Sequence, residues 1–225
     1  MKRIAFLLLP PTLLLCACSA DKPLDAGAPA NPPGVVASIG ATLPPGVGGP
    51  SPAGLPAASA PVPEDIARVR SEWANRDDLF ERCEIGPFEE AERAFEAQDW
   101  KGLLAIAQPW IERCPVDIDP RFFAMVALDE LGRKNESQEQ RRWVVGLVDS
   151  VLSSGDGKSP GTAYLAFTIA EEYAVLRIFG YVRDSQALLE NGIDCLGVHH
   201  ARTKQEMTVY FNPAPHWRGL MQREG

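Results

Sequence analysis

The spacing of apolar residues predicts helices in the middle of the chain. Between residues 64 and 154, apolar side chains recur at intervals of three and four residues, which places them on one face of a helix. Five helices are predicted in this way, and they are marked by Ile66, Phe88, Leu103, Phe122 and Trp143. The short breaks between them, and a weak internal similarity at an offset of 33 residues, are typical of stacked helical hairpins of the tetratricopeptide kind.

Residues 155–225 carry a different pattern, in which short runs of β-branched and aromatic residues alternate with turn signals. Four strands are predicted, over residues 162–169, 181–190, 193–200 and 206–211. Asn191-Gly192 lies between the second and third runs and is a strong signal for a two-residue hairpin turn.

One helix is predicted between the first two strands. Thr168 and Glu171 have the spacing of a capping box, in which each side chain accepts a hydrogen bond from the backbone N–H of the other residue, and Gly180 is placed to end the helix. The sequence therefore predicts an α+β fold, with N-terminal, tetratricopeptide-like helical hairpins followed by a small, mostly antiparallel sheet with one packed helix. Residues 64–154 and 155–225 are expected to form one continuous globular unit.

The N-terminal residues show neither period. Lys2 and Arg3 precede an apolar run that is too short to span a bilayer and that ends in Leu15-Cys16-Ala17-Cys18. This segment resembles a bacterial lipobox, which implies a signal peptide over residues 1–17 and acylation, for example with palmitate, at Cys18. A plain secretory signal is the alternative. Ser19 follows the lipid site in place of Asp, which resembles the pattern of lipoproteins sorted to the outer membrane.

Composition characterises the stretch between the lipid site and the first helix. Residues 19–63 contain 11 of the 20 prolines of the chain and only three charged residues. Such a composition favours extended polyproline conformations over a packed core. We therefore expect residues 18–63 to be a disordered tether that begins at the lipidated cysteine, the alternative being a low-complexity segment with no spacing role.

The charge of the remaining chain limits its partners. Residues 64–225 contain 19 Lys and Arg against 28 Asp and Glu, a formal net charge of −9. This excess of acidic groups argues against nucleic acid, and against an anionic lipid surface, as the main partner of the folded part. The lipid bilayer is expected to be contacted through the acylated N-terminus alone.

Residue types with catalytic or metal-binding chemistry are present, but their spacing is unsuitable. The run Gly155-Asp156-Gly157-Lys158-Ser159 has Leu152 where a phosphate-binding loop needs its first glycine, so a tight connecting loop is the better interpretation. Cys195 and His199 would lie about 13 Å apart on one face of a strand, which is too far to share a zinc ion, and His200 would point to the other face. No catalytic residue, metal site or cofactor is predicted.

Two cysteines are suitably placed for a disulfide. Cys83 precedes the second predicted helix and Cys114 follows the third. In an antiparallel helical hairpin these two ends lie at the same pole, and the export signal implies an oxidising compartment. We therefore expect a bond between Cys83 and Cys114, with two separate core cysteines as the alternative.

The chain also contains a set of short motifs: S-G-D-G-K-S-P-x-T-A over residues 154–163, E-E-Y-A-V-L-R over residues 171–177, Gln186, Asp194 and Y-F-N over residues 210–212. Together with C-P-V-D-I at residues 114–118, this set resembles the bacterial domain of unknown function 4919. The resemblance covers most of residues 80–220 and implies an often exported family. It brings no activity, so no catalytic residue is carried over.

These observations favour a lipoprotein of the bacterial envelope, anchored in the outer membrane and facing the periplasm, whose folded part binds another protein. A more specific hypothesis is an immunity-type protein that neutralises a basic toxin. A periplasmic enzyme that uses Glu172, Tyr173 or the loop at Gly155 is one alternative, and a structural spacer is the other.

Overall fold

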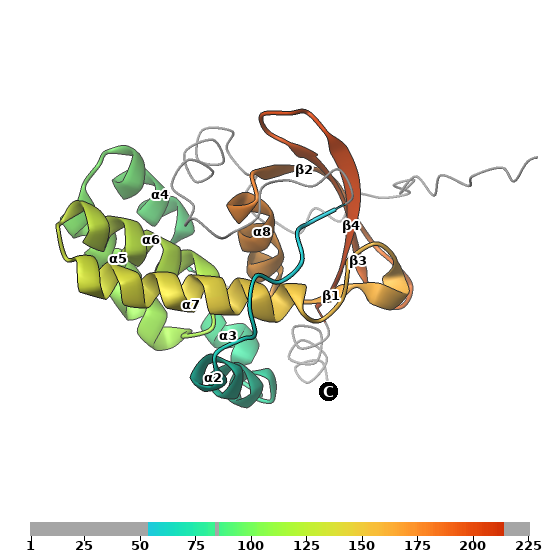
Figure 1. Ribbon diagram of the computed structural model, residues 1–225, viewed down its shortest axis with the longest axis horizontal. Coiled ribbons are helices and arrows are strands. Elements are labelled where there is room, and N and C mark those ends of the chain that lie inside the picture. Colours follow the sequence, from blue (N-terminus) through green and yellow to red (C-terminus); the bar gives the residue numbers. More distant parts are fainter. Residues whose placement is uncertain (1–53, 84–85, 214–225) are drawn as a thin grey trace, which may run out of the picture.

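A computed structural model describes residues 54–83 and 86–213 (Figure 1). The predicted signal peptide over residues 1–17, the lipid site at Cys18 and most of the predicted tether lie outside these ranges. The helices of the first half are α2 (Glu64–Ala74), α3 (Leu79–Cys83), α4 (Phe88–Glu96), α5 (Trp100–Arg113), α6 (Ile118–Glu130) and α7 (Lys134–Leu152). The second half contains the 3₁₀ turn η1 (Pro160–Thr162), β1 (Tyr164–Leu165), α8 (Ile169–Ile178), β2 (Tyr181–Leu188), β3 (Asp194–His200) and β4 (Glu206–Asn212).

Helix α6 forms the centre of the helical half. It packs against α5 on one side and α7 on the other, and it also contacts α8. Every residue from 118 to 128 is buried, because apolar residues occupy all faces of this helix rather than one stripe. Figure 1 shows α5, α6 and α7 side by side, with the long α7 extending towards the sheet. Among the described residues, no helix is both long and apolar enough to cross a membrane.

Helix α3 was not predicted. It has five residues, too few for a helical period to be visible in the sequence, and its two buried side chains are Leu79 and Cys83. The five other helices of this half correspond to the five predicted from the apolar period. Their mutual packing confirms helical hairpins in a mixed α and β fold, whereas the tetratricopeptide likeness stays a prediction.

The four strands lie in the order β1-β4-β3-β2. Strands β2, β3 and β4 pair antiparallel, whereas β1 pairs parallel with the end of β4, Tyr164 opposite Phe211 and Leu165 opposite Asn212. The predicted first strand over residues 162–169 is wrong for most of its length. Pro160 and Gly161 open a 3₁₀ turn before it and Thr168 already caps α8, so that only two residues remain for the strand.

The hairpin between β2 and β3 has a three-residue loop, not the predicted two-residue turn. The Leu189 amide donates to the Ile193 carbonyl at 2.8 Å, and the Gly192 amide donates to the Leu189 carbonyl at 2.9 Å. Gly192 has a φ of 76°, a backbone conformation that glycine adopts without a steric penalty. The glycine was therefore recognised as a turn residue, but its place in the turn was not.

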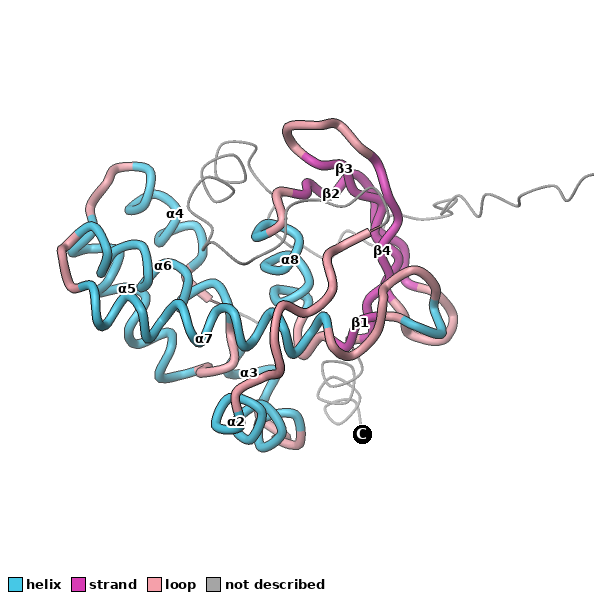
Figure 2. The backbone as a smooth tube through the Cα atoms, viewed as in Figure 1, coloured by secondary structure: helices cyan, strands magenta, loops and turns pink. Residues whose placement is uncertain are grey.

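Helix α8 connects the two halves. It lies between the helical half and the sheet (Figures 1 and 2), and it contacts both α6 and β2. Every residue from 171 to 178 is buried. Buried apolar residues of both halves belong to one hydrophobic cluster.

Residues 54–63, which we call the strap, were predicted to be part of the disordered tether, but they lie against the folded part. Leu55, Ala58 and Val62 pack against the core, and the backbone of the strap is hydrogen-bonded to Asp149 of α7. Figure 2 shows the strap as a loop that crosses the end of α7 on its way to α2. The end of the predicted tether is therefore ordered, because its few apolar side chains find a surface to cover.

Candidate functional site

The structure confirms the predicted disulfide between Cys83 and Cys114. The bond joins the end of α3 to the residue that follows α5, with 5.2 Å between the two Cα atoms. It encloses α4 and α5, so it restrains the helical hairpin at one pole. Its role is structural.

Of the two residues predicted to cap the start of α8, Thr168 acts as expected and Glu171 does not. The Thr168 hydroxyl accepts a hydrogen bond from the Glu171 amide at 3.1 Å, as an N-cap does. The Glu171 carboxylate, however, accepts from the Phe167 amide at 2.6 Å, one residue earlier than a capping box requires. It also forms a buried ion pair with Arg70 of α2, whose guanidinium lies 3.9 Å above the Phe167 ring. Glu171 therefore holds α2 against the start of α8.

A second buried ion pair joins the helical half to α8. Arg177 of α8 pairs with Asp119 at the start of α6, and its guanidinium lies 4.5 Å from the centre of the Phe88 ring. Beside this pair, Asp117 accepts hydrogen bonds from the Asp119 amide at 3.1 Å and from the Trp110 indole at 2.8 Å. Burial, and then the neighbouring carboxylate of Asp119, raise the pKa of Asp117 well above its ordinary range. The Arg177–Asp119 ion pair links α8 to α6, and it is buried together with Asp117.

Three residues of the family motifs meet in one hydrogen-bond network. Tyr173 of α8 and Arg183 of β2 both donate to the side-chain carbonyl of Gln186, whose amide nitrogen donates to Asp194 of β3 at 3.2 Å. Burial raises the pKa of Tyr173 to about 12, so its hydroxyl stays protonated and acts as a donor. Glu172, the carboxylate considered for an enzyme, is completely buried and lines neither of the two cavities that the structure describes.

Within the described residues, His199, His200 and Cys195 do not gather into a metal site. The Nδ1 atom of His199 lies 2.8 Å from the Asp184 carboxylate, and His200 is buried and accepts from the Thr203 amide at 3.1 Å. Burial lowers the pKa of His200, which favours its neutral form. In residues 54–83 and 86–213, no three His, Cys, Asp or Glu side chains are close enough to hold a metal ion. His216 lies outside the described residues.

The larger of the two described cavities lies beside β4, where the glycine-containing loop crosses the edge of the sheet. It has a volume of about 150 Å³. Its walls are formed by the loop, by Tyr164 of β1, by β4 and by the start of the strap. The lining residues are Gly54, Leu55, Asp156, Gly157, Lys158, Tyr164, Met207, Thr208 and Val209.

The loop is shaped by its own backbone and by two side chains. Asp156 accepts from the Lys158 amide at 3.0 Å and from the Thr162 hydroxyl at 2.6 Å. Gly157 has a φ of 63°, and a Cβ at this position would lie 2.2 Å from the ring of Tyr164. Its carbonyl accepts from the Tyr210 amide of β4 at 2.9 Å. The glycines that suggested a phosphate loop therefore serve to bring the loop close to the sheet.

The cavity is suited to binding a polar group rather than to transferring protons. The hydrogen bond that the Thr162 hydroxyl donates to Asp156 lowers the pKa of this carboxylate, which keeps it ionised and makes it a weak base. Burial raises the pKa of Tyr164 to about 12, so its hydroxyl is neutral. Lys158 is exposed, and its positive charge also contributes to lowering the pKa of Asp156. A cation, a fixed carboxylate and neutral hydroxyls face the cavity together.

Sequence reasoning found the loop but not the cavity. Lys158 and its glycines were visible as a motif, whereas Tyr164, Thr208 and Leu55 come from three other segments of the chain. Nothing in the local sequence marks these three residues as neighbours of the loop. Arg70 and Asp149 likewise carried no signal, because the partners of both are 90 or more residues away.

Comparisons with known proteins give a family and nothing further. A family model described as "Domain of unknown function (DUF4919)" matches residues 87–218. No curated protein and no solved structure gives a significant match to the chain. The matched region includes α4 and α5, which the disulfide encloses, and the loop that lines the cavity. It also includes the Arg177–Asp119 ion pair and Glu171, but not Arg70, the partner of Glu171.

Proposed function

The chain belongs to the DUF4919 family, and since that membership assigns no activity, we propose from the residues themselves that it is a lipid-anchored envelope protein whose folded part binds a protein partner. The anchor is Cys18, and the site of attachment is the outer membrane on its periplasmic side. The lipobox-like segment before Cys18 and the proline-rich residues 19–53 support this placement.

The cavity beside β4 is the observation on which the binding role rests. It combines a concave surface with a cation and hydroxyl groups, which are the features by which a site recognises a polar side chain or a peptide group. Thr208 and Lys158 are exposed at its edge, so a macromolecule can reach them. The fixed state of Asp156 and the neutral state of Tyr164 support binding over catalysis.

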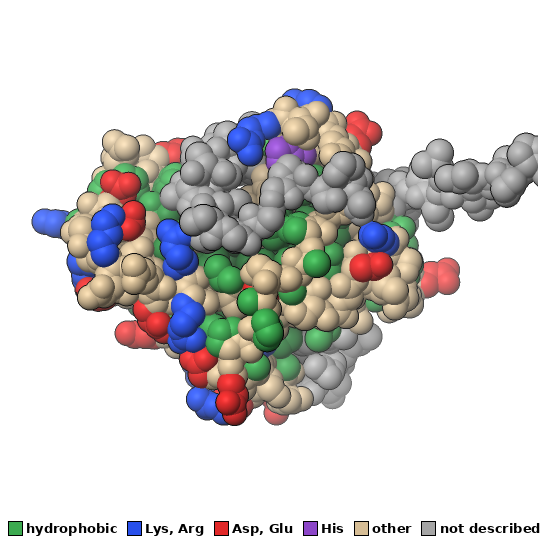
Figure 3. Space-filling model, viewed as in Figure 1, with side chains coloured by type: hydrophobic (Ala, Val, Ile, Leu, Met, Phe, Trp, Pro, Cys, Tyr) green, Lys and Arg blue, Asp and Glu red, His purple; other side chains and the backbone are tan. Residues whose placement is uncertain are grey.

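The charge of the chain supports a basic partner. Residues 64–225 carry a formal net charge of −9, and acidic and basic side chains are scattered over the face seen in Figure 3. A basic protein, such as a toxin that an immunity-type lipoprotein neutralises, is attracted by this excess. Association with such a partner slows as the salt concentration rises, because long-range attraction between exposed charges is screened.

The anchoring part of the proposal is tested by membrane fractionation. Cys18→Ala should move the protein from the membrane fraction to the soluble fraction, while Cys16→Ala should leave it in the membrane fraction. If Cys18→Ala stays as firmly attached as the unmodified chain, acylation at this residue is ruled out.

The binding part is tested by site-specific photocrosslinking in intact cells. A photoreactive phenylalanine at Thr208, at the cavity, should give an adduct of one discrete mass, and the same group at the exposed Glu112 of α5 should not. Lys158→Glu should abolish the Thr208 adduct, because the cavity then lacks the cation that holds an oxygen atom of the partner, even though the partner as a whole is basic. Equal adducts at both positions, or none at Thr208, would contradict a binding role for this cavity.

A further inference from the structure

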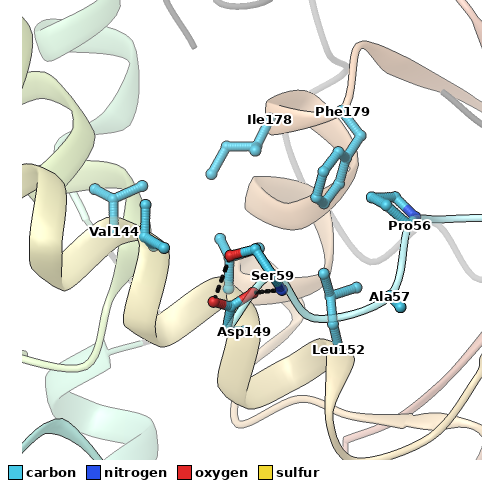
Figure 4. Close-up of a pocket in the computed structure, with 10 residues that line it drawn as sticks. Pro56, Ala57, Ser59, Val144, Asp149, Leu152, Ile178 and Phe179 are labelled. Atoms are coloured by element: carbon cyan, nitrogen blue, oxygen red, sulfur yellow. Dashed lines mark hydrogen bonds between the residues drawn. The ribbon is translucent and has the colours of Figure 1, made fainter. Parts of the chain in front are cut away.

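The strap is attached to the folded part chiefly through one side chain. Asp149 of α7 accepts three hydrogen bonds from it: one from the Ser59 amide at 2.7 Å, one from the Ser59 hydroxyl at 2.7 Å and one from the Ala60 amide at 3.2 Å. Figure 4 shows Ser59 pointing at Asp149 from the loop above α7. Asp149 itself is buried, so these bonds satisfy a carboxylate that water reaches poorly.

The surface beneath the strap consists of buried apolar side chains. They come from α7 and from the C-terminal end of α8, and we call this surface the α7–α8 groove. They are Val144, Val148, Leu152, Ile178 and Phe179. Figure 4 shows Ile178 and Phe179 on the opposite side of the groove from Leu152. In Figure 3, apolar side chains gather along the middle of the same face.

The residues of the strap are less buried than those of the α7–α8 groove beneath it. No residue from 54 to 63 is buried; each is half-buried or exposed. The strap has no helix, and its attachment combines a bridge at Gly54 and a few partly buried side chains with the three bonds to Asp149. Segments with these properties open at a small fraction of the free energy of global unfolding. An open strap would leave the groove as a contiguous apolar patch, which soluble surfaces rarely expose without a binding partner.

The strap shows which chemistry the groove accepts. Pro56, Pro61 and Pro63 restrict its backbone, which bends at Leu55 and again at Ser59 and Ala60, and Pro63 has the φ of −55° and ψ of 138° of polyproline II. Gly146 of α7 leaves room for Ile66 of α2, because a Cβ there would lie 2.5 Å from the Ile66 side chain, and it also lets Pro63 at the end of the strap approach, at 3.3 Å. Beside the strap, a crevice of only about 10 Å³ remains, so small residues fill the groove closely.

We propose that the α7–α8 groove is an interaction surface for a proline-containing segment of a partner protein that presents small apolar residues to the groove and, at a bend, a serine to Asp149. The strap is its resident occupant, and a partner segment of the same chemistry displaces it. The prolines of such a segment restrict its backbone before binding, which lowers the entropy that is lost when it binds. The groove residues do not line the cavity beside β4, although the start of the strap, Gly54 and Leu55, lines that cavity as well. The test of the groove does not involve that cavity's partner.

A pair of proline substitutions separates the strap's attachment from its composition. Ser59→Pro removes both Ser59 donors to Asp149, while Ala57→Pro adds the same residue at an exposed position whose amide makes no hydrogen bond within the described residues. Neither substitution touches the groove. The probe is a fluorescent synthetic peptide with the sequence of residues 54–63, added to the full chain and followed by fluorescence anisotropy.

Ser59→Pro should bind the peptide at least about tenfold more tightly than the unmodified chain or Ala57→Pro, because the competing strap is released. Adding Asp149→Ala to Ser59→Pro should weaken binding about tenfold or more, since the peptide then loses the same three bonds. Equal binding by Ser59→Pro and Ala57→Pro, or no effect of Asp149→Ala, would overturn the proposal. Circular dichroism verifies that each variant is folded.

A second measurement uses the unmodified chain and so does not depend on any variant folding. Hydrogen exchange of the Ser59 and Ala60 amides should accelerate severalfold when unlabelled peptide is added in excess, because the strap is displaced. Exchange at these amides that is unchanged at peptide concentrations up to the millimolar range would show a strap that only serves its own chain.

Discussion

Removal of the Cys83–Cys114 disulfide gives the most quantitative prediction of this structure. The two cysteines are 31 residues apart, and the bond closes a loop that contains α4 and α5. In the chain-entropy model, the bond lowers the entropy of the unfolded chain by about 12 cal/mol/K for a loop of this length, or about 3.7 kcal/mol at 25 °C. We expect Cys83→Ala combined with Cys114→Ala to lower the free energy of unfolding by about this amount.

The assay is equilibrium urea unfolding, followed by the fluorescence of the tryptophans. Both cysteines are buried, so alanine is chosen because serine would place an extra hydroxyl in the core. Each single variant loses the same bond, and each should therefore be about as destabilised as the double variant. Additive single effects, or a loss of less than about 1 kcal/mol in the double variant, would refute the reasoning.

Three further predictions concern the interior. Arg70→Ala should lower the free energy of unfolding by about 3–5 kcal/mol because it leaves the buried Glu171 carboxylate unpaired, and Arg70→Met with Glu171→Gln should recover most of the loss. Gly157→Ala should destabilise by about 2 kcal/mol, because the residue has a φ of 63° and its Cβ would lie 2.2 Å from the ring packed against it; Gly161→Ala, with open space around it, should be close to neutral in the same urea assay. The pKa of Asp117 is raised by burial, so the protonated form is favoured in the folded state: its contribution to stability is fully present below the unfolded pKa of about 4 and is lost as the pH rises through the folded value. Unfolding measured from pH 4 upwards should show a decline that Asp117→Asn flattens, and an equally steep decline in that variant would contradict the assignment.

Local signals in the sequence were sufficient for most elements and for three of the site residues. The apolar period located five helices of the first half, and Thr168 was identified as an N-cap because its hydroxyl bonds an amide only three residues away. Cys83 and Cys114 were paired because two helices joined by a short loop must place those ends together. These inferences succeed because a helix, a cap and a hairpin are each decided by residues close in the chain.

The features that the sequence did not reveal depend on partners distant in the chain. Glu171 looked like half of a capping box, yet its carboxylate is used by an arginine 101 residues earlier. Asp149 looked like one polar residue on an amphipathic helix, yet it holds the strap across 90 residues. A buried charge must find a donor wherever the fold provides one, and nothing in its immediate neighbourhood identifies that donor.

For this protein, the sequence by itself determined most of the elements, their order and the family, and it favoured the disulfide, because these follow from short-range periodicity, spacing and motifs. Only the tertiary structure decided that residues 54–63 are ordered, that β1 joins β4 in parallel, and that the loop at Gly157 encloses a cavity. Each of these depends on surfaces that come into existence when α7, α8 and the sheet pack together. The strap's few apolar residues have nothing to cover until that packing is complete.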